Sequence, residues 1–218
     1  MKGGLDVKLR WHGHACFSLI SSDETRILTD PFDEHVGYEL PRVEADVVTI
    51  SHGHFDHCYV TPEMGNPEIV RNPGTTVFRD VRITGVPSFH DNNGGKTRGT
   101  NIMFSFKIDD IQIAHLGDLG HTLGPEHVMA LGHPQVLLIP VGGTYTIDWQ
   151  EASRVVETLE PKIVIPMHYK TAALSFPLDT VDNFLQDKVR VRRESYSTIE
   201  ITPDNLPADQ EIIVLSYI

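Results

Sequence analysis

Residues 51–58 read SHGHFDHC, and between His52 and His57 this stretch holds three histidines and one aspartate. Imidazole nitrogens and carboxylate oxygens are ligands that zinc takes in proteins. In an extended segment, side chains two positions apart share a face, so His52 and His54 would project to the same side. Asp56 and His57 follow on the next turn, where they can serve a neighbouring metal ion. The stretch therefore predicts a metal site.

Further candidate ligands come directly after apolar runs of strand length. The run DVVTIS ends at the His52 cluster, and VRITGVP, IQIAHL and KIVIPM are followed closely by His90, Asp118 and His168. In open α/β sheets, ligands bind beyond the carboxyl ends of the strands. Convergence of these four ends would bring together seven ligands, namely His52, His54, Asp56, His57, His90, Asp118 and His168. That number suits two divalent ions that share one bridging carboxylate.

The apolar runs also predict the class of fold. Runs rich in valine and isoleucine, which favour strands, cover residues 7–11, 15–20, 26–29, 46–51, 75–78, 81–87, 102–108, 111–116, 136–141, 162–167, 198–201 and 211–216. Helices are expected at 124–132, 148–161 and 177–186, the second with Asp148 as N-cap and Glu151 three residues later. Strands dominate the first half and alternate with helices in the second, which indicates an α/β layered sandwich.

Length and composition narrow the classes of partner. A chain of 218 residues suits one domain, residues 1–218, and its formal net charge of −12 disfavours nucleic acid and anionic lipid as partners. The sequence shows neither a signal peptide nor the ~18 consecutive apolar residues of a membrane span. Cys16 and Cys58 are expected to be free thiols. We expect a cytoplasmic protein with a small-molecule substrate and no membrane or nucleic-acid partner; whether it forms a homo-oligomer is left open.

The ligand pattern resembles the metallo-β-lactamase superfamily. The matching residues are His52-x-His54-x-Asp56-His57, then His90, then Gly117-Asp118, then His168, in the order of that family. The resemblance implies a four-layer αβ/βα sandwich. It also implies that His52, His54 and His90 hold one metal ion, that Asp56, His57 and His168 hold the other, and that Asp118 bridges the two.

Two positions separate this chain from better-known branches of that superfamily. True β-lactamases commonly have cysteine where this chain has Asp118, and the di-iron oxygen-reducing members have glutamate where it has His54. Both differences favour a dinuclear hydrolase that uses zinc, with manganese as the alternative. The implied mechanism is attack by a hydroxide that bridges the two ions, with Asp56 and Asp118 as catalytic residues.

Shorter motifs narrow the resemblance to the small, one-domain branch that includes L-ascorbate-6-phosphate lactonase. They are WHGHACF (11–17), TDPF (29–32), LGD (116–118), PVGGTYTID (140–148) and MHYKT (167–171). A small ester or lactone, phosphorylated or not, is therefore the expected substrate, and Tyr145 and Lys170 are candidate substrate contacts. Two alternatives stay open: a phosphodiesterase or ribonuclease of the same superfamily, which the acidic balance disfavours, and a metal-binding sensor without catalysis.

The remaining histidines and glycines carry weaker expectations. His115 lies within a strand-like run and is expected to be a hydrogen-bonded core residue, whereas His14 is either a neighbour of the site or structural. The other histidines, His12, His35, His121, His127 and His133, are expected to be structural or on the surface. Gly142 and Gly143 are expected in a tight turn that lets the backbone approach the site. The Gly- and Asn-rich stretch 90–101 is expected to be one long mobile loop with a functional role.

Overall fold

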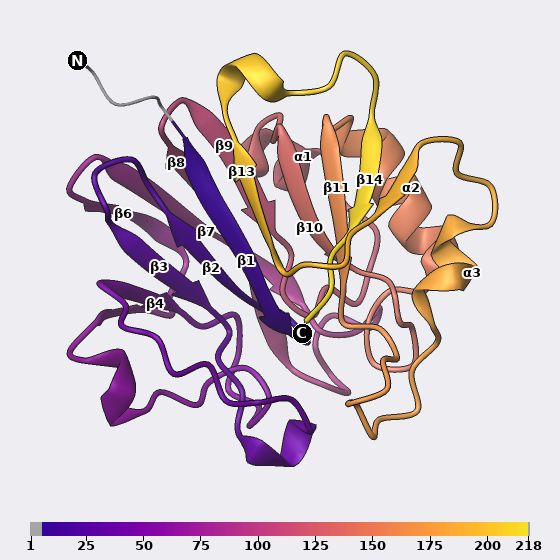
Figure 1. Cartoon of the computed structure of the whole chain (residues 1–218). Coiled ribbons are helices and arrows are strands. Elements are labelled where there is room, and N and C mark those ends of the chain that lie inside the picture. The colour runs from indigo at the N-terminus through magenta and orange to yellow at the C-terminus, as the bar shows by residue number, and fades with distance from the viewer. Residues whose placement is uncertain (1–5, 218) are drawn as a thin grey trace.

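The computed structural model describes residues 6–217, which form two mixed β-sheets packed face to face (Figure 1). The first sheet has the order β13-β1-β2-β3-β4-β5, with strands at Thr198–Ile201, Val7–Gly13, Cys16–Ile20, Arg26–Thr29, Val47–Thr49 and Glu68–Val70. The second has the order β12-β14-β11-β10-β9-β8-β7-β6, with strands at Val191–Arg193, Glu211–Val214, Ile163–Met167, Val136–Pro140, Ile111–His115, Thr100–Ile108, Val81–Phe89 and Gly74–Phe78.

The directions of the strands bring the ends of several ligand-bearing runs to one edge. β7 and β9 both pair antiparallel with β8, so they run in the same direction. β10 pairs parallel with β9, and β11 pairs parallel with β10. The carboxyl ends of β7, β9 and β11 therefore lie at the same edge of the second sheet. In the first sheet, β4 leads into the His52 cluster.

The α-helices cover the outer face of the second sheet. α1 (Pro125–Leu131) packs on β7 and β8, α2 (Trp149–Leu159) packs on β10, and α3 (Val181–Leu185) packs on α2 (Figure 1). Asp148 caps α2 as expected, since its carboxylate accepts a hydrogen bond from the N–H of Glu151 at 2.8 Å. These helices and sheets confirm the expected α/β layered sandwich.

The outer face of the first sheet is covered differently. Leu28 and Val48, from β3 and β4, pack under Phe32, Val36 and Tyr38. These three residues lie in an irregular segment that includes the 3₁₀ turn η1 (Glu34–Val36); two further turns are η2 (Pro62–Met64) and η3 (Pro203–Asn205). Within residues 6–217, all α-helices of the sandwich therefore belong to the second sheet, and irregular chain forms the outer layer of the first.

The core between the sheets is continuous and apolar. β10 and β11 are buried along their whole length. Their uninterrupted apolar runs predicted this, because such runs are typical of strands covered on both faces. Trp11, Phe17, Phe104 and Phe106 supply the largest fully buried side chains. None of the helices within residues 6–217 has the length and apolar character needed to cross a bilayer. A rigid double sheet thus positions the loops at its edge, where the polar cluster lies.

Candidate metal centre

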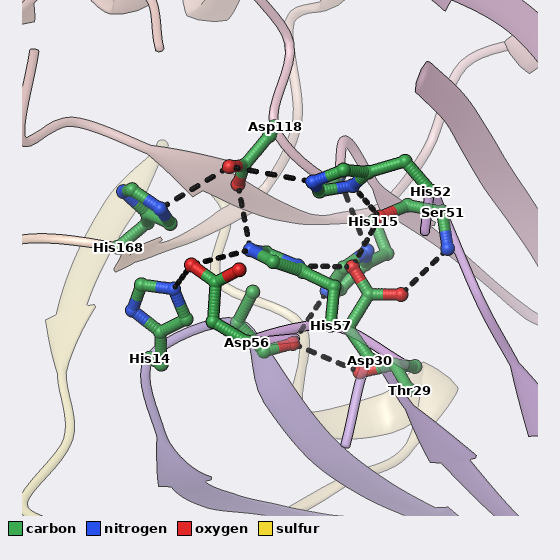
Figure 2. A network of polar contacts seen from close by, with 12 residues as sticks. His14, Thr29, Asp30, Ser51, His52, Asp56, His57, His115, Asp118 and His168 are labelled. Atoms are coloured by element: carbon green, nitrogen blue, oxygen red, sulfur yellow. Dashed lines mark hydrogen bonds and ion pairs between the residues drawn. The ribbon is translucent and has the colours of Figure 1, made fainter. Parts of the chain in front are cut away.

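The structure brings all seven predicted ligands together at the strand ends, and it adds His14. His52, His54, Asp56 and His57 follow β4, His90 directly follows β7, Asp118 lies three residues after β9, and His168 directly follows β11. His14 lies in the tight connection between β1 and β2, with a φ angle of 51°. Figure 2 shows six members of this cluster turned toward one another.

Asp118 occupies the centre of the cluster. Its Oδ2 atom lies 3.2 Å from Nε2 of His90 and 3.3 Å from Nε2 of His168. Its Oδ1 atom lies 3.3 Å from Nε2 of His57, and Oδ2 lies 3.9 Å from Nε2 of His52. The backbone N–H of Asp118 donates to the side chain of Asn101 at 2.9 Å, which holds the loop after β9 in place. One carboxylate thus reaches four imidazoles from three segments of the chain.

A buried network orients two of these imidazoles. The carboxylate of Asp30 accepts hydrogen bonds from the hydroxyl of Ser51 at 2.5 Å and from Nδ1 of His57 at 2.9 Å (Figure 2). Because the Ser51 hydroxyl gives its proton to Asp30, it accepts one from Nδ1 of His52, 2.9 Å away. Both imidazoles therefore donate through Nδ1 to this network, which directs their Nε2 atoms toward the cluster.

His14 and Asp56 form the other side of the cluster. Nε2 of His14 lies 3.2 Å from Oδ2 of Asp56, and the same oxygen lies 3.7 Å from Nε2 of His57. The rings of His14 and His168 lie 4.1 Å apart, centre to centre, with their planes tilted by 40°. Of the two alternatives for His14, the structure shows the neighbour of the site.

Burial and neighbouring charges shift the pKa values of the carboxylates and imidazoles in the cluster. Burial opposes the charged form of Asp118, but His168 and His57 hold its pKa well below the usual range. Burial also opposes the charged form of His57, yet Asp118 and Asp56 raise the pKa of His57 above its ordinary value. Burial and the neighbouring His57 lower the pKa of His52 to about 3, so His52 is a neutral imidazole at pH 7.

The donor set fits divalent cations. Within the described part of the chain, the buried atoms without a hydrogen-bond partner include Nε2 of His52, Nε2 of His57 and Oδ1 of Asp118. Lone pairs of imidazole that face carboxylate oxygens repel them unless a proton or a cation lies between. Imidazole nitrogen together with carboxylate oxygen is a donor set that zinc and related divalent ions accept.

The cluster divides into sets whose ligand atoms lie within 4.8 Å of one another. They are His52, His54 and His90; then His14, Asp56, His57 and His168; then His52, His57 and Asp118. The first two sets have the composition expected for two metal positions, with His14 added to the second. The third set contains Asp118, the expected bridging residue, between them.

A cavity of about 580 Å³ opens onto the cluster. The polar cluster forms its floor through His54, Asp56, His90, Asp118 and His168. Its walls include the aromatic rings of Phe55, Tyr145 and Phe176, together with Thr97 and Arg98 from the 90–101 loop. This volume falls within the range of small-molecule sites, roughly 300–1,000 Å³.

The two predicted substrate contacts have different positions. Tyr145 lines the cavity, as the sequence suggested. Lys170 does not: its ammonium group donates to the backbone carbonyls of Leu174 and Phe176, and it is absent from the cavity lining. In this structure Lys170 stabilises the loop that carries Phe176. Arg98 supplies the cation of the cavity wall.

Sequence reasoning missed Asp30 and Ser51 as residues of the site. Asp30 belongs to TDPF, which was noted only as a framework motif, and its distance along the chain from His57 gave no sign of contact. His115 behaves as expected, because it is buried and its Nε2 donates to the carbonyl of Ala15 at 2.8 Å. Cys16 and Cys58 are free thiols, as predicted.

Comparison with known proteins agrees with this geometry. The family profile "Beta-lactamase superfamily domain" matches residues 8–168. A UPF0173 metal-dependent hydrolase of Thermoplasma acidophilum is 32% identical over 192 residues, which cover 76% of this chain and 84% of the relative. A crystal structure from Thermotoga maritima, assigned to the Zn-dependent hydrolases of the metallo-β-lactamase superfamily, is 42% identical with a TM-score of 0.81, over 96% of this chain and 98% of that one.

A more distant structure shares the fold. A metallo hydrolase of Ignicoccus hospitalis is 24% identical with a TM-score of 0.63, over 90% of this chain and 98% of that chain. The two packed mixed sheets and the His/Asp cluster at their strand ends agree with the class that these relatives indicate, the metal-dependent hydrolases. The chain belongs to the beta-lactamase superfamily and, within it, to the UPF0173 metal-dependent hydrolases. The narrower resemblance to the lactonase-containing branch stays a prediction.

Proposed function

We propose that this protein hydrolyses a small ester or lactone with the help of two divalent metal ions, zinc or manganese. The observation that carries the proposal is the arrangement around Asp118, where four imidazoles from three segments present Nε2 atoms to one carboxylate at the floor of a cavity. His52, His54 and His90 would hold one ion, and Asp56, His57 and His168 the other. Asp118 would contact both.

When bound, such ions would lower the pKa of a water molecule and polarise the carbonyl oxygen of the substrate. The residues of the chain have their own parts in the reaction. Asp30 and Ser51 keep the Nε2 lone pairs of His57 and His52 directed at the cluster. His14 directs Asp56, whose carboxylate lines the cavity and can orient an attacking water.

The two rival functions differ in what they require of the surface and the site. A phosphodiesterase or ribonuclease would need cations to neutralise a phosphate backbone, and the formal net charge of −12 opposes this. Arg192 and Arg193, from the basic stretch 189–193, are already paired with Glu194 and Asp182. A non-catalytic sensor would need a metal cluster but no substrate cavity beside it, whereas here Asp56 and Asp118 both line one.

The test is a panel of lactones, carboxylic esters, thioesters and phosphodiesters, assayed with protein reconstituted separately with zinc and with manganese. We expect turnover of at least one lactone or ester and slower turnover of the phosphodiesters. Hydrolysis of phosphodiesters alone would replace the proposed substrate class and keep the metal site. Stoichiometric metal without turnover of any compound would favour the sensor.

A further inference from the structure

The cavity beside the cluster has a wall of distinct chemistry. Phe55, which is 50% exposed, lies next to Phe176, with ring centres 6.2 Å apart. Phe176 also lies next to Tyr145, with ring centres 6.4 Å apart and an angle of 84° between the ring planes. The three rings form a continuous aromatic wall above the polar floor. Aromatic surface of this kind binds the flat, apolar part of a small molecule.

Arg98 adds a cation with unused hydrogen-bond donors to this wall. Its guanidinium lies 5.4 Å from the centre of the Tyr145 ring, and its Nη2 donates to the carbonyl of Thr144 at 3.1 Å. A guanidinium has five N–H donors. Within residues 6–217, no carboxylate pairs with Arg98, in contrast to Arg190, Arg192 and Arg193, which each pair with an acidic side chain. Arg98 therefore keeps donors and a full charge for a ligand.

The loop that carries Arg98 is held in one conformation. The buried carboxylate of Asp91 accepts hydrogen bonds from the backbone N–H groups of Asn93, Gly95, Thr97 and Arg98, at 2.7–2.9 Å. These bonds, with that of Arg98 as the largest contribution, lower the pKa of Asp91 to about 2. The long 90–101 segment is thus an ordered loop, and it places Arg98 at the cavity.

The loops that carry Tyr145 and Phe176 are hydrogen-bonded to each other, and the Arg98 side chain joins them to the 90–101 loop. The hydroxyl of Thr144 donates to the carbonyl of Pro177 at 2.9 Å, and the N–H of Asp179 donates to the carbonyl of Gly142 at 2.9 Å. Lys170 binds the carbonyls of Leu174 and Phe176. The Arg98, Tyr145 and Phe176 side chains therefore belong to one connected rim, formed before a ligand arrives.

From this rim, and resting on the proposed hydrolase function, we infer that the substrate is an anion: a small ester or lactone with a carboxylate or phosphate group that pairs with Arg98 and a flat apolar body that lies on Phe55, Tyr145 and Phe176. A planar guanidinium binds such oxyanions through paired N–H bonds. Arg98 is a specificity-determining residue, which selects among esters without acting on the scissile bond.

The other basic side chains near the site do not fit this role. Lys170 is occupied by two backbone carbonyls. Lys96 is exposed on the same loop as Arg98 but does not line the cavity. This difference supplies a matched control, because Lys96→Met and Arg98→Met remove the same charge from the same loop.

The kinetic test uses 4-acetoxybenzoate and 4-acetoxybenzamide, two aryl esters that differ in charge. We expect the metal-loaded wild type to prefer the anionic ester by about tenfold or more in kcat/KM, chiefly through KM, since hydrogen bonds to charged groups are the stronger ones. Arg98→Met should abolish the preference, because kcat/KM for the anionic ester should fall to that for the neutral ester. Arg98→Lys should restore part of it, and Lys96→Met should match wild type. A preference that survives in Arg98→Met, or a wild type without preference, overturns the inference.

A binding test separates this inference from the hydrolase proposal. Benzoate, phenyl phosphate and benzamide are titrated into metal-free wild type and metal-free Arg98→Met, with ligand-observed NMR as the readout. We expect wild type to bind benzoate or phenyl phosphate more tightly than benzamide, and the two anions together show which oxyanion fits better. Arg98→Met should bind all three equally. The hydrolase proposal fails only if no compound of the panel is hydrolysed, whereas equal binding of benzoate and benzamide by wild type would refute the inference independently.

Discussion

Nδ1 of His57 lies 2.9 Å from Oδ2 of Asp30, and both side chains are fully buried. The same oxygen accepts the hydroxyl of Ser51, which in turn receives the Nδ1 proton of His52. One carboxylate outside the ligand cluster therefore fixes the orientation and the tautomer of two imidazoles within it. Such partners commonly matter to metal affinity almost as much as the ligands themselves.

Asp30→Asn is expected to weaken metal binding by about 10- to 100-fold. Asparagine has nearly the same size, but its amide offers one acceptor oxygen where the carboxylate offers two. The hydroxyl of Ser51 and Nδ1 of His57 share Oδ2, whereas Oδ1 accepts the backbone N–H of Ser51, so an amide NH₂ in either position would face a donor and disturb this network. The measurement is a chelator competition with zinc at fixed pH. Asp80→Asn, an exposed aspartate in the turn between β6 and β7, is the control, and equal affinities in the two variants would contradict the orienting role of Asp30.

His54→Ala is expected to lower the metal content from about two ions to about one ion per chain, since imidazole ligands carry such sites. His54 is the exposed member of the set that it forms with His52 and His90, and its ring centre lies 4.5 Å from that of His52. The other set would keep its ion. Elemental analysis after zinc reconstitution and desalting measures the content. His133→Ala, which removes an exposed histidine outside the cluster, should retain both ions; a loss of metal in both variants would show that the cluster is not the metal site.

Asp118→Asn is expected to reduce kcat by roughly 10²-fold or more on any true substrate. Metal-assisted steps stabilise the transition state by several kcal/mol, and each ~1.4 kcal/mol lost is about tenfold in rate. The substitution keeps the size of the side chain but removes the charge that faces His57, His90 and His168. Unchanged turnover in a variant with unchanged metal content would refute the dinuclear mechanism.

The local pattern of the sequence predicted much of this architecture. The run 26–29 and the run 198–201 coincide with β3 and β13, and the helix expected at 148–161 is observed at Trp149–Leu159. The short strands β5 (Glu68–Val70) and β12 (Val191–Arg193) were missed, because their residues are mostly exposed or half-buried and carry charges that conceal a strand pattern. Their pairing depends on neighbouring strands rather than on their own composition.

Prediction of the site from local sequence patterns has the same limit. His52, His90, Asp118 and His168 were found because each follows an apolar run, which is a signal within a few residues of sequence. Asp30 and Arg98 act across loops whose conformation the sequence does not reveal. Lys170 and Arg98 look alike as cations near the ligands, and only the hydrogen bonds of Lys170 to backbone carbonyls distinguish them.

Asp91→Asn is expected to loosen the loop that carries Arg98. The pKa of Asp91 is lowered from 3.8 to about 2, so the carboxylate holds the loop at every pH above about 4 and loses this effect only as the pH falls through 2. The amide of asparagine has one acceptor oxygen, whereas the four backbone N–H donors of the loop share two carboxylate oxygens in wild type. Hydrogen exchange at the amides of Asn93, Gly95, Thr97 and Arg98 should accelerate. Asp80→Asn is again the control, and unaltered protection in Asp91→Asn would mean that the loop is ordered by other contacts.

Gly142→Ala is expected to destabilise the fold and disturb the position of His168. A Cβ atom at residue 142 would lie 2.2 Å from the carbonyl oxygen of His168 and 3.0 Å from Cα of Tyr169, so backbone rather than a flexible side chain would have to move. The sequence predicted a backbone approach at Gly142 and Gly143, and the structure shows what is approached. Overpacking of this kind typically costs about 1–3 kcal/mol. The movement would also displace a candidate ligand, so zinc affinity should fall together with Tm.

Gly53→Ala is the matched control for this substitution. A Cβ atom at residue 53 would meet nothing within 4 Å, although Gly53 also lies beside the metal cluster. We therefore expect Gly53→Ala to leave Tm and zinc affinity nearly unchanged, whereas Gly142→Ala lowers both. Thermal unfolding of the metal-free proteins isolates the packing cost, and the additional shift on zinc addition reports the displacement of His168. If Gly142→Ala lowers Tm but gains as much from zinc as wild type does, the turn supports the fold without positioning the ligand.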